Sequence, residues 1–360
     1  MREDKSAYSV RRSPHSLHRG GVDKKIIHCI VPPTFMAKKN SRRSMNIQPA
    51  ITTIALRTDP TTSGSYLNYV DTAKELSKVN RRLYEQGRMY GYQGLTFIWK
   101  SKGTLATIEC SVRTAGNTWI TQNAFVKGKA LWNQMQQLVL EDNPSIAGKW
   151  HDYKVQLNGG QSSARQLSAR DGAGALYLDG EWDLSTYVMP QHVVDPVSGQ
   201  PLPAVEFTAM LIGADTASKK SLVKAYEESR ATVSADQPNV PAGMSTSFFN
   251  LLTDSGSQEP ELALVIEGEG DNAPYDLDNY PGGDLNAVNP VTVSYAAISA
   301  QEVDGQLGGF IAPCGLLQIE IKGYDASGVA VPAASMPAID ILLHVAPGTY
   351  KGVAAVPMGQ

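Results

Sequence analysis

Residues 316–322, with the sequence LLQIEIK, carry the clearest signal for the fold, because apolar and polar residues alternate along them. Successive side chains of an extended strand point to opposite faces of the sheet. Leu317, Ile319 and Ile321 therefore share one face, and the polar residues of the stretch share the other. One apolar and one polar face are typical of an antiparallel strand that covers a core on one side.

Runs of β-branched and aromatic residues recur on both sides of this stretch, from residue 47 to the end of the chain. Residues 91–99 and 104–112 are separated by Lys102 and Gly103, and we predict that they form an antiparallel hairpin with a Ser-Lys-Gly turn. The other predicted strands are 51–57, 150–157, 175–189, 204–213, 261–267, 291–299, 310–322 and 338–345.

Three segments show helical spacing of apolar residues: 67–86, 124–141 and 218–233. In the first, Asp71 is the predicted N-terminal cap and Gly87 the predicted end. Its polar face is basic and is a second candidate for phosphate contact, although a solvated face accounts for it equally well. The basic residues of this face are Lys74, Lys78, Arg81 and Arg82.

The fold class predicted from this pattern is all-β, a sandwich or barrel with inserted helices and long loops. Strands and helices do not alternate as they do in a doubly wound fold. No repeat of fixed period and no change of composition divides residues 44–360, so we expect one elaborated domain there.

The composition excludes several classes. The 360 residues are 42% hydrophobic, which is enough for a core and excludes a wholly disordered chain. No apolar run approaches the ~18 residues of a membrane span, so none is predicted. The three cysteines are too few and too scattered for a disulfide framework or a cysteine-based zinc site.

Charge is divided unevenly along the chain. Residues 1–43 hold eleven Lys and Arg against three acids and carry +8, and since the whole chain carries −3, residues 44–360 carry −11. A basic arm on an acidic body is typical of proteins that neutralise phosphates. A solvated terminus or a localisation signal are the alternatives. The candidate phosphate-binding residues are Arg11, Arg12, Arg19, Lys24, Lys25, Lys38, Lys39, Arg42 and Arg43.

The arm lacks the apolar core of a secretory signal, because its one apolar run, 26–31, is interrupted by His28. The sequence MAKKNSRR (36–43) has the form of a natural protein start. We therefore expect residues 1–35 to be an upstream in-frame extension.

No catalytic motif is present: there is no G-x-S-x-G, P-loop, H-E-x-x-H or Rossmann glycine pattern. Outside the arm, His151, His192 and His344 are far apart, and we expect structural roles for them. Cys110 and Cys314 lie in or beside strands and are expected to be buried, inert thiols.

An acidic loop is the one candidate metal site. Oxygen ligands on a flexible loop suit calcium, but the spacing is not that of an EF-hand, and a solvated surface loop is the favoured interpretation. A carboxylate pair for glycoside hydrolysis is the other alternative. The acidic residues are Glu267, Glu269, Asp271, Asp276, Asp278 and Asp284.

Taken together, the arm MAKKNSRR (36–43), the basic helix and strand LNYVDTAKELSKVNRRLYEQGRMYGY (67–92) and the aromatic residues Trp99 and Trp182 resemble the single jelly-roll capsid proteins of small non-enveloped viruses. Those of small circular Rep-encoding single-stranded DNA viruses are the most similar in style. The resemblance implies a jelly-roll shell domain over residues 44–360 behind the arm 1–43.

The same resemblance implies a non-enzymatic protein without a cofactor, calcium aside, that assembles with copies of itself into an icosahedral shell. Such a protein is part of the virion and is assembled inside the host cell, where the nucleus is one candidate compartment. It would package single-stranded nucleic acid without reading its sequence. The residues implied are Lys38, Lys39, Arg42, Arg43, Arg11 and Arg12.

Two other functions fit the same pattern. One is a carbohydrate-binding or glycan-cleaving β-sandwich protein, which would use surface aromatics such as Trp150, Tyr177 or Trp182 together with an acidic pair. The other is a phage or cell-surface structural protein that binds no nucleic acid.

Overall fold

The computed structural model describes residues 48–58, 65–99, 103–146, 152–189, 203–229, 248–249 and 289–359. All of them belong to one compact unit, Met45–Gln360. Two antiparallel sheets and a smaller third sheet make up most of its regular structure, with three α-helices among the described residues. The prediction of a mostly antiparallel β fold with few helices is confirmed.

Sheet A contains six strands. Its order is β1 (Thr53–Arg57), β12 (Ile339–Val345), β3 (Arg88–Trp99) and β10 (Phe310–Pro313), and β9 (Asp304–Leu307) and β14 (Ala355–Pro357) also pair with β3. All pairs are antiparallel. Strands β9 and β10 follow each other along one edge of β3, with Leu307 opposite Leu95 and Phe310 opposite Tyr92.

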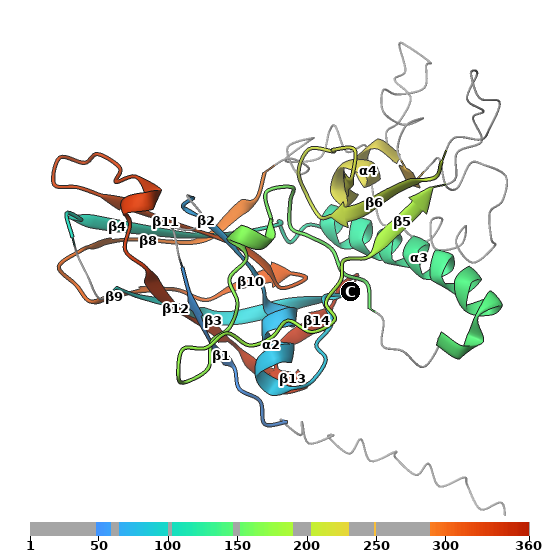
Figure 1. Cartoon of the computed structure of the whole chain (residues 1–360), viewed down its shortest axis with the longest axis horizontal. Helices are drawn as coiled ribbons and strands as arrows, with labels where there is room; N and C mark the ends of the chain where they lie inside the picture. Colours follow the sequence, from blue (N-terminus) through green and yellow to red (C-terminus); the bar gives the residue numbers. More distant parts are fainter. Residues whose placement is uncertain are drawn as a thin grey trace, which may run out of the picture. The chain divides into compact units, whose positions relative to one another are not determined.

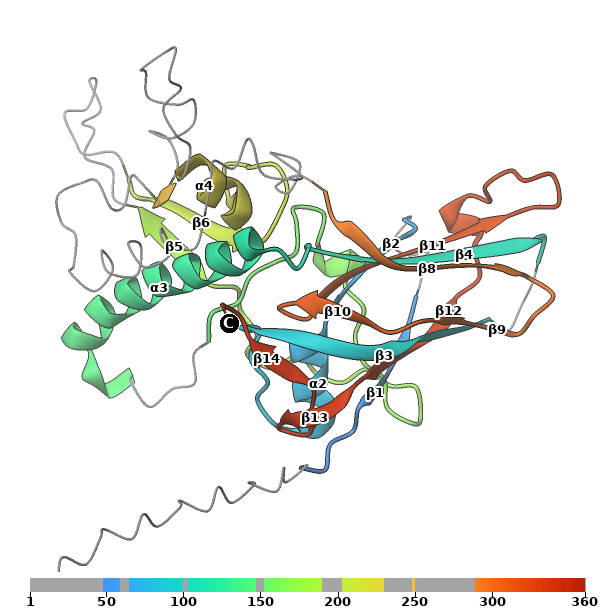
Figure 2. The ribbon, with the colours of Figure 1, turned by 180° about the vertical axis from the view of Figure 1, so that it is seen from behind.

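Sheet B contains four antiparallel strands in the order β2 (Leu67–Asp71), β11 (Leu316–Tyr324), β4 (Thr107–Thr114) and β8 (Val291–Ser299). The two sheets face each other in both views (Figures 1 and 2). The main core lies between them: Phe97 and Trp99 of sheet A and Ile319 of sheet B are among its buried members. The alternation predicted for 316–322 is confirmed for Leu317, Ile319 and Ile321, which are buried in this core, and for the partly exposed Glu320 and Lys322, whereas Gln318 on the predicted polar face is buried.

The predicted hairpin of 91–99 and 104–112 is wrong, because β3 and β4 lie in different sheets. Strand β3 pairs with β12 on one side and with β9 and β10 on the other, so no edge of it is left for β4. Strand β4 pairs with β11 and β8 instead. The chain turns near Gly103, which has a φ of 50°, and crosses from one sheet to the other.

The segment 67–86 divides into strand β2 and helix α2 (Thr72–Asn80). Its first five residues pair with β11, which removes them from the helix. The predicted cap is confirmed, since Asp71 accepts a hydrogen bond from the backbone N–H of Lys74 at 3.1 Å. The helix ends at Arg81, in the left-handed region with φ 52°, and not at Gly87.

A second core is built mainly from the long connection between β4 and β8, and Tyr69, Cys314, Leu316 and Met358 also belong to it. The connection contributes α3 (Trp119–Asp142), α4 (Leu222–Ser229) and sheet C. Sheet C contains β5 (Thr186–Met189), β6 (Val205–Met210) and β7 (Lys219–Ser221), with β6 and β7 parallel. Figure 1 shows α3 beside this sheet. No helix of the described residues is long and apolar enough to cross a membrane.

Two predicted strands form only in part or not at all. Of the described residues of 150–157, only Gln156 forms a bridge, to Met210. The flanking backbone N–H groups bond to side chains: Val155 N–H donates to Gln86 Oε1 and Leu157 N–H to Gln161 Oε1, both at 2.7 Å. Of 175–189 only β5 is a strand. The predicted strand 310–322 is split into β10 and β11 by a turn at Cys314 and Gly315, both with positive φ.

The remaining elements are short. They are η1 (Pro144–Ile146), η2 (Ser163–Arg165), η6 (Ala333–Ser335) and β13 (Pro347–Tyr350). The predicted strand 261–267 lies outside the described residues.

Candidate functional site

The predicted nucleic-acid-binding and metal-binding residues lie outside the described residues. This holds for Arg11, Arg12, Lys38, Lys39, Arg42 and Arg43 of the arm, and for Glu267, Glu269, Asp271, Asp276, Asp278 and Asp284 of the acidic loop. Trp150, His151 and His192 also lie outside them. In the described part of the chain, no group of three His, Cys, Asp or Glu side chains could hold a metal ion.

The described histidine and cysteines have the structural roles expected of them. His344 lies between two strands, with Nδ1 3.2 Å from Thr53 Oγ1 and Nε2 3.2 Å from Thr96 Oγ1. Cys110 and Cys314 are fully buried free thiols. Burial raises the pKa of Cys110 to about 12 and that of Cys314 well above its ordinary value, so neither is a thiolate at neutral pH.

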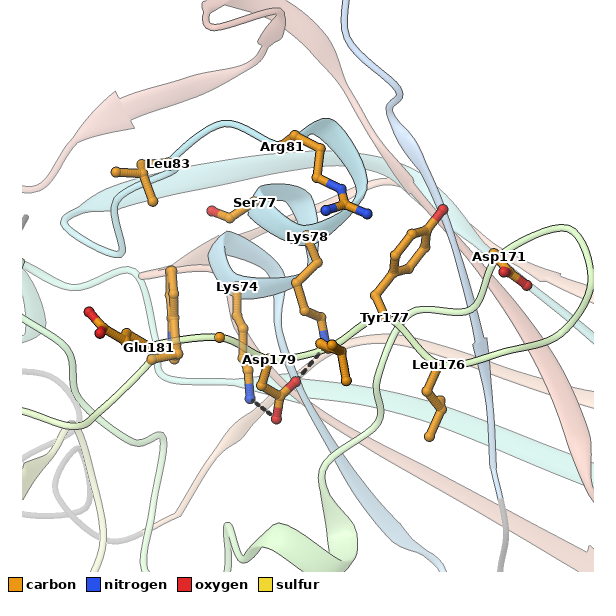
Figure 3. Close-up of a pocket in the computed structure, with 13 residues that line it drawn as sticks. Lys74, Ser77, Lys78, Arg81, Leu83, Asp171, Leu176, Tyr177, Asp179 and Glu181 are labelled. Carbon is orange, nitrogen blue, oxygen red and sulfur yellow. Dashed lines mark hydrogen bonds and ion pairs between the residues drawn. The ribbon is translucent and has the colours of Figure 1, made fainter.

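A hollow that several charged side chains line lies between α2 and the irregular segment 171–182, and we call it the α2 groove. Its volume is about 630 Å³. Figure 3 shows the basic side chains of α2 directed toward this segment. The groove is lined by Lys74, Ser77, Lys78, Arg81, Leu83, Asp171, Leu176, Tyr177, Leu178, Asp179, Gly180, Glu181 and Trp182.

The two lysines of the groove are neutralised within the protein. Lys74 Nζ and Lys78 Nζ each lie 2.9 Å from a carboxylate oxygen of Asp179, as the dashed lines in Figure 3 mark. Burial acts to raise the pKa of Asp179, but the hydrogen bonds and charges of the two lysines outweigh it and lower the pKa. Because both lysines are buried and paired, they form neither a solvated face nor a phosphate-binding one.

Glu75 lies beneath this pair and is fully buried. Its Oε2 accepts hydrogen bonds from Lys78 Nζ at 2.8 Å and from the backbone N–H of Ala169 at 2.7 Å, whereas no partner is found for Oε1. Burial raises the pKa of Glu75 despite the opposing charge of Lys78. The carboxylate therefore fastens the segment around Ala169 to α2.

Asp71 joins the other end of the same segment to the helix. Besides capping α2, its Oδ2 accepts hydrogen bonds from Gln86 Nε2 at 2.7 Å and from Trp182 Nε1 at 2.9 Å. Burial raises the pKa of Asp71, although these hydrogen bonds oppose the shift. With three donors on one buried carboxylate, Asp71 orders the groove's backbone and is not presented to a substrate.

The rim of the groove differs from its floor. Leu176 and Leu178 are 57% and 91% exposed, and Leu83 is exposed at the opposite side of the groove (Figure 3). Of the proposed sugar-binding aromatics, Tyr177 and Trp182 are half-buried against the main core. Exposed apolar side chains above neutralised charges are suited to contact with another macromolecule.

A second polar surface lies on the outer face of sheet B, where Glu320 lies between two cations. Arg113 Nη2 is 2.5 Å and Lys322 Nζ 2.9 Å from its carboxylate oxygens. The hydrogen bond to Glu320 raises the pKa of Lys322. These side chains border a hollow of about 140 Å³ that Glu109 and Tyr295 also line. This is the polar face predicted from residues 316–322.

Sequence reasoning missed Asp179, which organises the groove. It lies about a hundred residues beyond the two lysines, and no spacing rule links them. The Asp-Gly pair at 179–180 indicates a turn but no ion pair. No protein-family model matches the chain, and neither a curated protein nor a solved structure similar to it is found.

Proposed function

We propose that this protein is a viral capsid protein with a jelly-roll shell domain, which assembles with copies of itself and packages single-stranded nucleic acid through its basic N-terminal arm. The observation that carries the proposal is the order in which the strands pair. No single residue of a jelly roll identifies it, but its two Greek keys have a definite strand order.

Eight strands are obtained when β9 and β10 are counted as one interrupted strand. In chain order they are β1, β2, β3, β4, β8, β9–β10, β11 and β12. The first pairs with the eighth, the second with the seventh, the third with the sixth and the fourth with the fifth. This is the nested pairing of one long hairpin of four double strands.

Folding that hairpin over on itself brings the third strand beside the eighth and the fourth beside the seventh. Both contacts are present, as β3·β12 and β4·β11. The chain thus alternates between sheets A and B at each of the connections from β1 to β4. A jelly roll has this topology, whereas a simple meander would pair consecutive strands.

Assembly requires surfaces that another copy can cover. The rim of the α2 groove supplies one, because Leu178 and Leu176 are exposed beside it. Closed symmetric assemblies bury such patches repeatedly through the same contact. The elements around the second core, α3, α4 and sheet C, lie at one end of the sandwich (Figure 1) and add a further surface for such contacts.

The arm supplies the charge for packaging. Its +8 stands against −11 for the remainder of the chain, so phosphate neutralisation is assigned to residues 1–43. Lys38, Lys39, Arg42 and Arg43 are the nearest of these cations to the first strand in the sequence. For the acidic loop the solvated interpretation is kept, with calcium at subunit contacts as the alternative.

Sedimentation velocity over a range of salt and calcium concentrations tests assembly. We expect particles far larger than the 38.8 kDa chain, visible by negative-stain microscopy. Only monomer or dimer under every condition would contradict the proposal, and a monomer that binds glycans would favour the carbohydrate-binding alternative. Loss of particles in EDTA would support the calcium site.

Packaging is tested separately with Lys38→Gln, Lys39→Gln, Arg42→Gln and Arg43→Gln combined. Particles of this variant should form, because no core residue changes, but they should contain less nucleic acid, measured as a lower ratio of absorbance at 260 and 280 nm. An unchanged ratio would show that these four residues do not package the genome.

A further inference from the structure

Three cations of the body lie close to its first described residues, 48–51. The backbone N–H of Ile51 donates to Asn80 Oδ1 at 2.7 Å, and Asn80 Nδ2 donates to the Ile51 carbonyl at 3.0 Å. On the other side, Gly352 is packed so closely against Gln48 and Ala50 that a Cβ there would lie 2.5 Å from the Gln48 carbonyl. Residues 48–51 therefore contact Asn80, which precedes Arg81 in the chain, and Gly352, which follows Lys351.

Arg81, Arg82 and Lys351 form what we call the arm-root cluster. Within the described part of the chain, none of the three forms an ion pair. Arg81 and Arg82 are exposed. The nearby Glu85 is paired with Arg88 at 3.8 Å. The cluster thus has three positive charges without an ion-pair partner, whereas the net charge of residues 44–360 is −11.

The side chains of the cluster are positioned by neutral groups. The Arg81 guanidinium carbon lies 5.9 Å from the centre of the Tyr177 ring, and Figure 3 shows the two side chains next to each other. Lys351 Nζ donates to the Leu83 carbonyl and lies 5.2 Å from the Tyr350 ring centre. Such contacts order a cation without cancelling its charge.

The backbone gives an independent indication. Three non-glycine residues of the described chain have a positive φ, and two of them are Arg81 at 52° and Lys351 at 50°. Glycine or asparagine would adopt this conformation with less strain. Residues with a strained backbone are often found at functional sites. Here both have long, positively charged side chains, and their chain neighbours Asn80 and Gly352 contact residues 48–51.

We propose that the arm-root cluster binds the phosphate backbone of single-stranded nucleic acid. The inference rests on the proposed packaging function and assigns a second part of its binding site. Along the chain, five peptide units separate Arg43 from Gln48, so the last cation of the arm precedes the described residues by at most about 18 Å of chain.

The experiment measures binding of a fluorescent 30-nucleotide oligo-dT to the full chain by anisotropy over a range of NaCl concentrations. The cluster variant combines Arg81→Asn, Arg82→Gln and Lys351→Asn. Asparagine tolerates positive φ, which offsets the contacts that the two long side chains lose, so the melting temperature of this variant should stay close to that of the parent. A control of equal charge change combines Arg165→Gln, Lys219→Gln and Lys220→Gln, which lie away from this segment.

Each phosphate contact on a single strand contributes roughly 0.7 to the slope of log affinity against log salt. The cluster variant should therefore lose about 2 from the slope, and about 100-fold in affinity at 0.1 M salt. The control should keep the parent's slope. An oligo-rU of the same length should give the same loss, since only phosphates are bound.

The outcomes separate the inference from the function on which it rests. If the arm variant of Lys38, Lys39, Arg42 and Arg43 loses slope but the cluster variant keeps the parent's slope, the cluster binds no nucleic acid and the packaging proposal stands. If the parent itself binds neither oligonucleotide, or binds without salt dependence, both proposals are wrong. An equal loss in the control would also contradict the inference, because overall charge would then explain it.

Discussion

Two carboxylates of this protein each lie between two cations, but in different surroundings. Asp179 lies between Lys74 and Lys78 at the α2 groove, and Glu320 lies between Arg113 and Lys322 on sheet B. The side chains of Lys74 and Lys78 are 8% and 5% exposed, whereas those of Arg113 and Lys322 are 30% and 36% exposed.

The contribution of an ion pair to folding stability depends on whether water can solvate the charge that remains when its partner is removed. Water can solvate Arg113 or Lys322 if Glu320 is removed, so their pairing adds little to stability. Lys78 has no such access, and a buried cation without a partner is costly. The ion pairs of the α2 groove therefore stabilise the fold, whereas those of Glu320 on sheet B form a polar surface.

Removal of Glu75 should have the largest effect. Glu75→Ala deprives buried Lys78 of one partner and the Ala169 N–H of its acceptor, and we expect a loss of about 3 kcal/mol in the free energy of unfolding. Guanidinium denaturation measures it. Glu75→Gln, which retains an acceptor and the volume, should cost less. A loss below about 1 kcal/mol for Glu75→Ala would show that the ion pairs of the groove do not stabilise the fold.

The direct comparison uses matched neutral substitutions. Asp179→Asn should cost about 1.5 kcal/mol, because the buried Lys74 and Lys78 lose charged hydrogen bonds, although solvent screens Asp179, which is 52% exposed. Glu320→Gln should cost about 0.5 kcal/mol, because its partners remain hydrated. Urea denaturation of both variants provides the measurement. Equal losses would remove the distinction between the two regions.

Acid should distinguish carboxylates within the groove. The pKa of Asp179 is below its ordinary value of 3.8, so its stabilisation is present above that value and is lost as the pH falls through the folded-state pKa. The parent should therefore lose stability in acid more steeply than Asp179→Asn. Thermal unfolding between pH 2 and 7 measures the difference, and parallel curves would contradict the expectation.

Glu75 should show the opposite sign. Burial raises its pKa, so its contribution is fully present below the ordinary value of 4.5 and declines as the pH rises through the folded-state pKa. Relative to Glu75→Gln, the parent should thus become less stable as the pH rises through that range. The same thermal unfolding series includes this variant, and the reverse trend would show that Lys78 outweighs burial.

Salt should produce the smallest effect. A double-mutant cycle on Arg113 and Glu320 should give a coupling of a few tenths of a kcal/mol that falls further between about 0.05 and 0.5 M NaCl. The coupling of Lys78 with Glu75 should change little, because salt screens buried pairs much less. A groove coupling that falls in parallel with that of sheet B would indicate that water reaches Lys78.

Local features of the fold were predictable. Strand β8 occupies 291–299 as predicted, and the alternation at 316–322 identified the buried face of β11. The cap of α2 was predictable because the short side chain of Asp71 accepts a hydrogen bond from the backbone N–H of Lys74, only three residues further along the chain. The end of that helix was not predicted, since Arg81 takes a conformation that its residue type disfavours.

Of the candidate site, the sequence indicated the basic residues of α2 but not their states. The same pattern of Lys74, Lys78, Arg81 and Arg82 yields two buried, paired lysines and two exposed arginines. The difference arises because Asp179 covers only part of α2. Its position depends on hydrogen bonds from Trp182 to Asp71 and from Ala169 to Glu75, which are distant in sequence.

Composition and local pattern were sufficient to predict the β-rich class, the faces of single strands, the cap of α2 and the charge difference between residues 1–43 and the rest. These properties depend on neighbours a few residues apart and on composition. The three-dimensional fold was needed to show that β3 and β4 lie in opposite sheets, that Lys74 and Lys78 are neutralised, and that Asn80 and Gly352 contact residues 48–51. A period of two residues determines which face a side chain takes but not which strand is its neighbour, and burial depends on that neighbour.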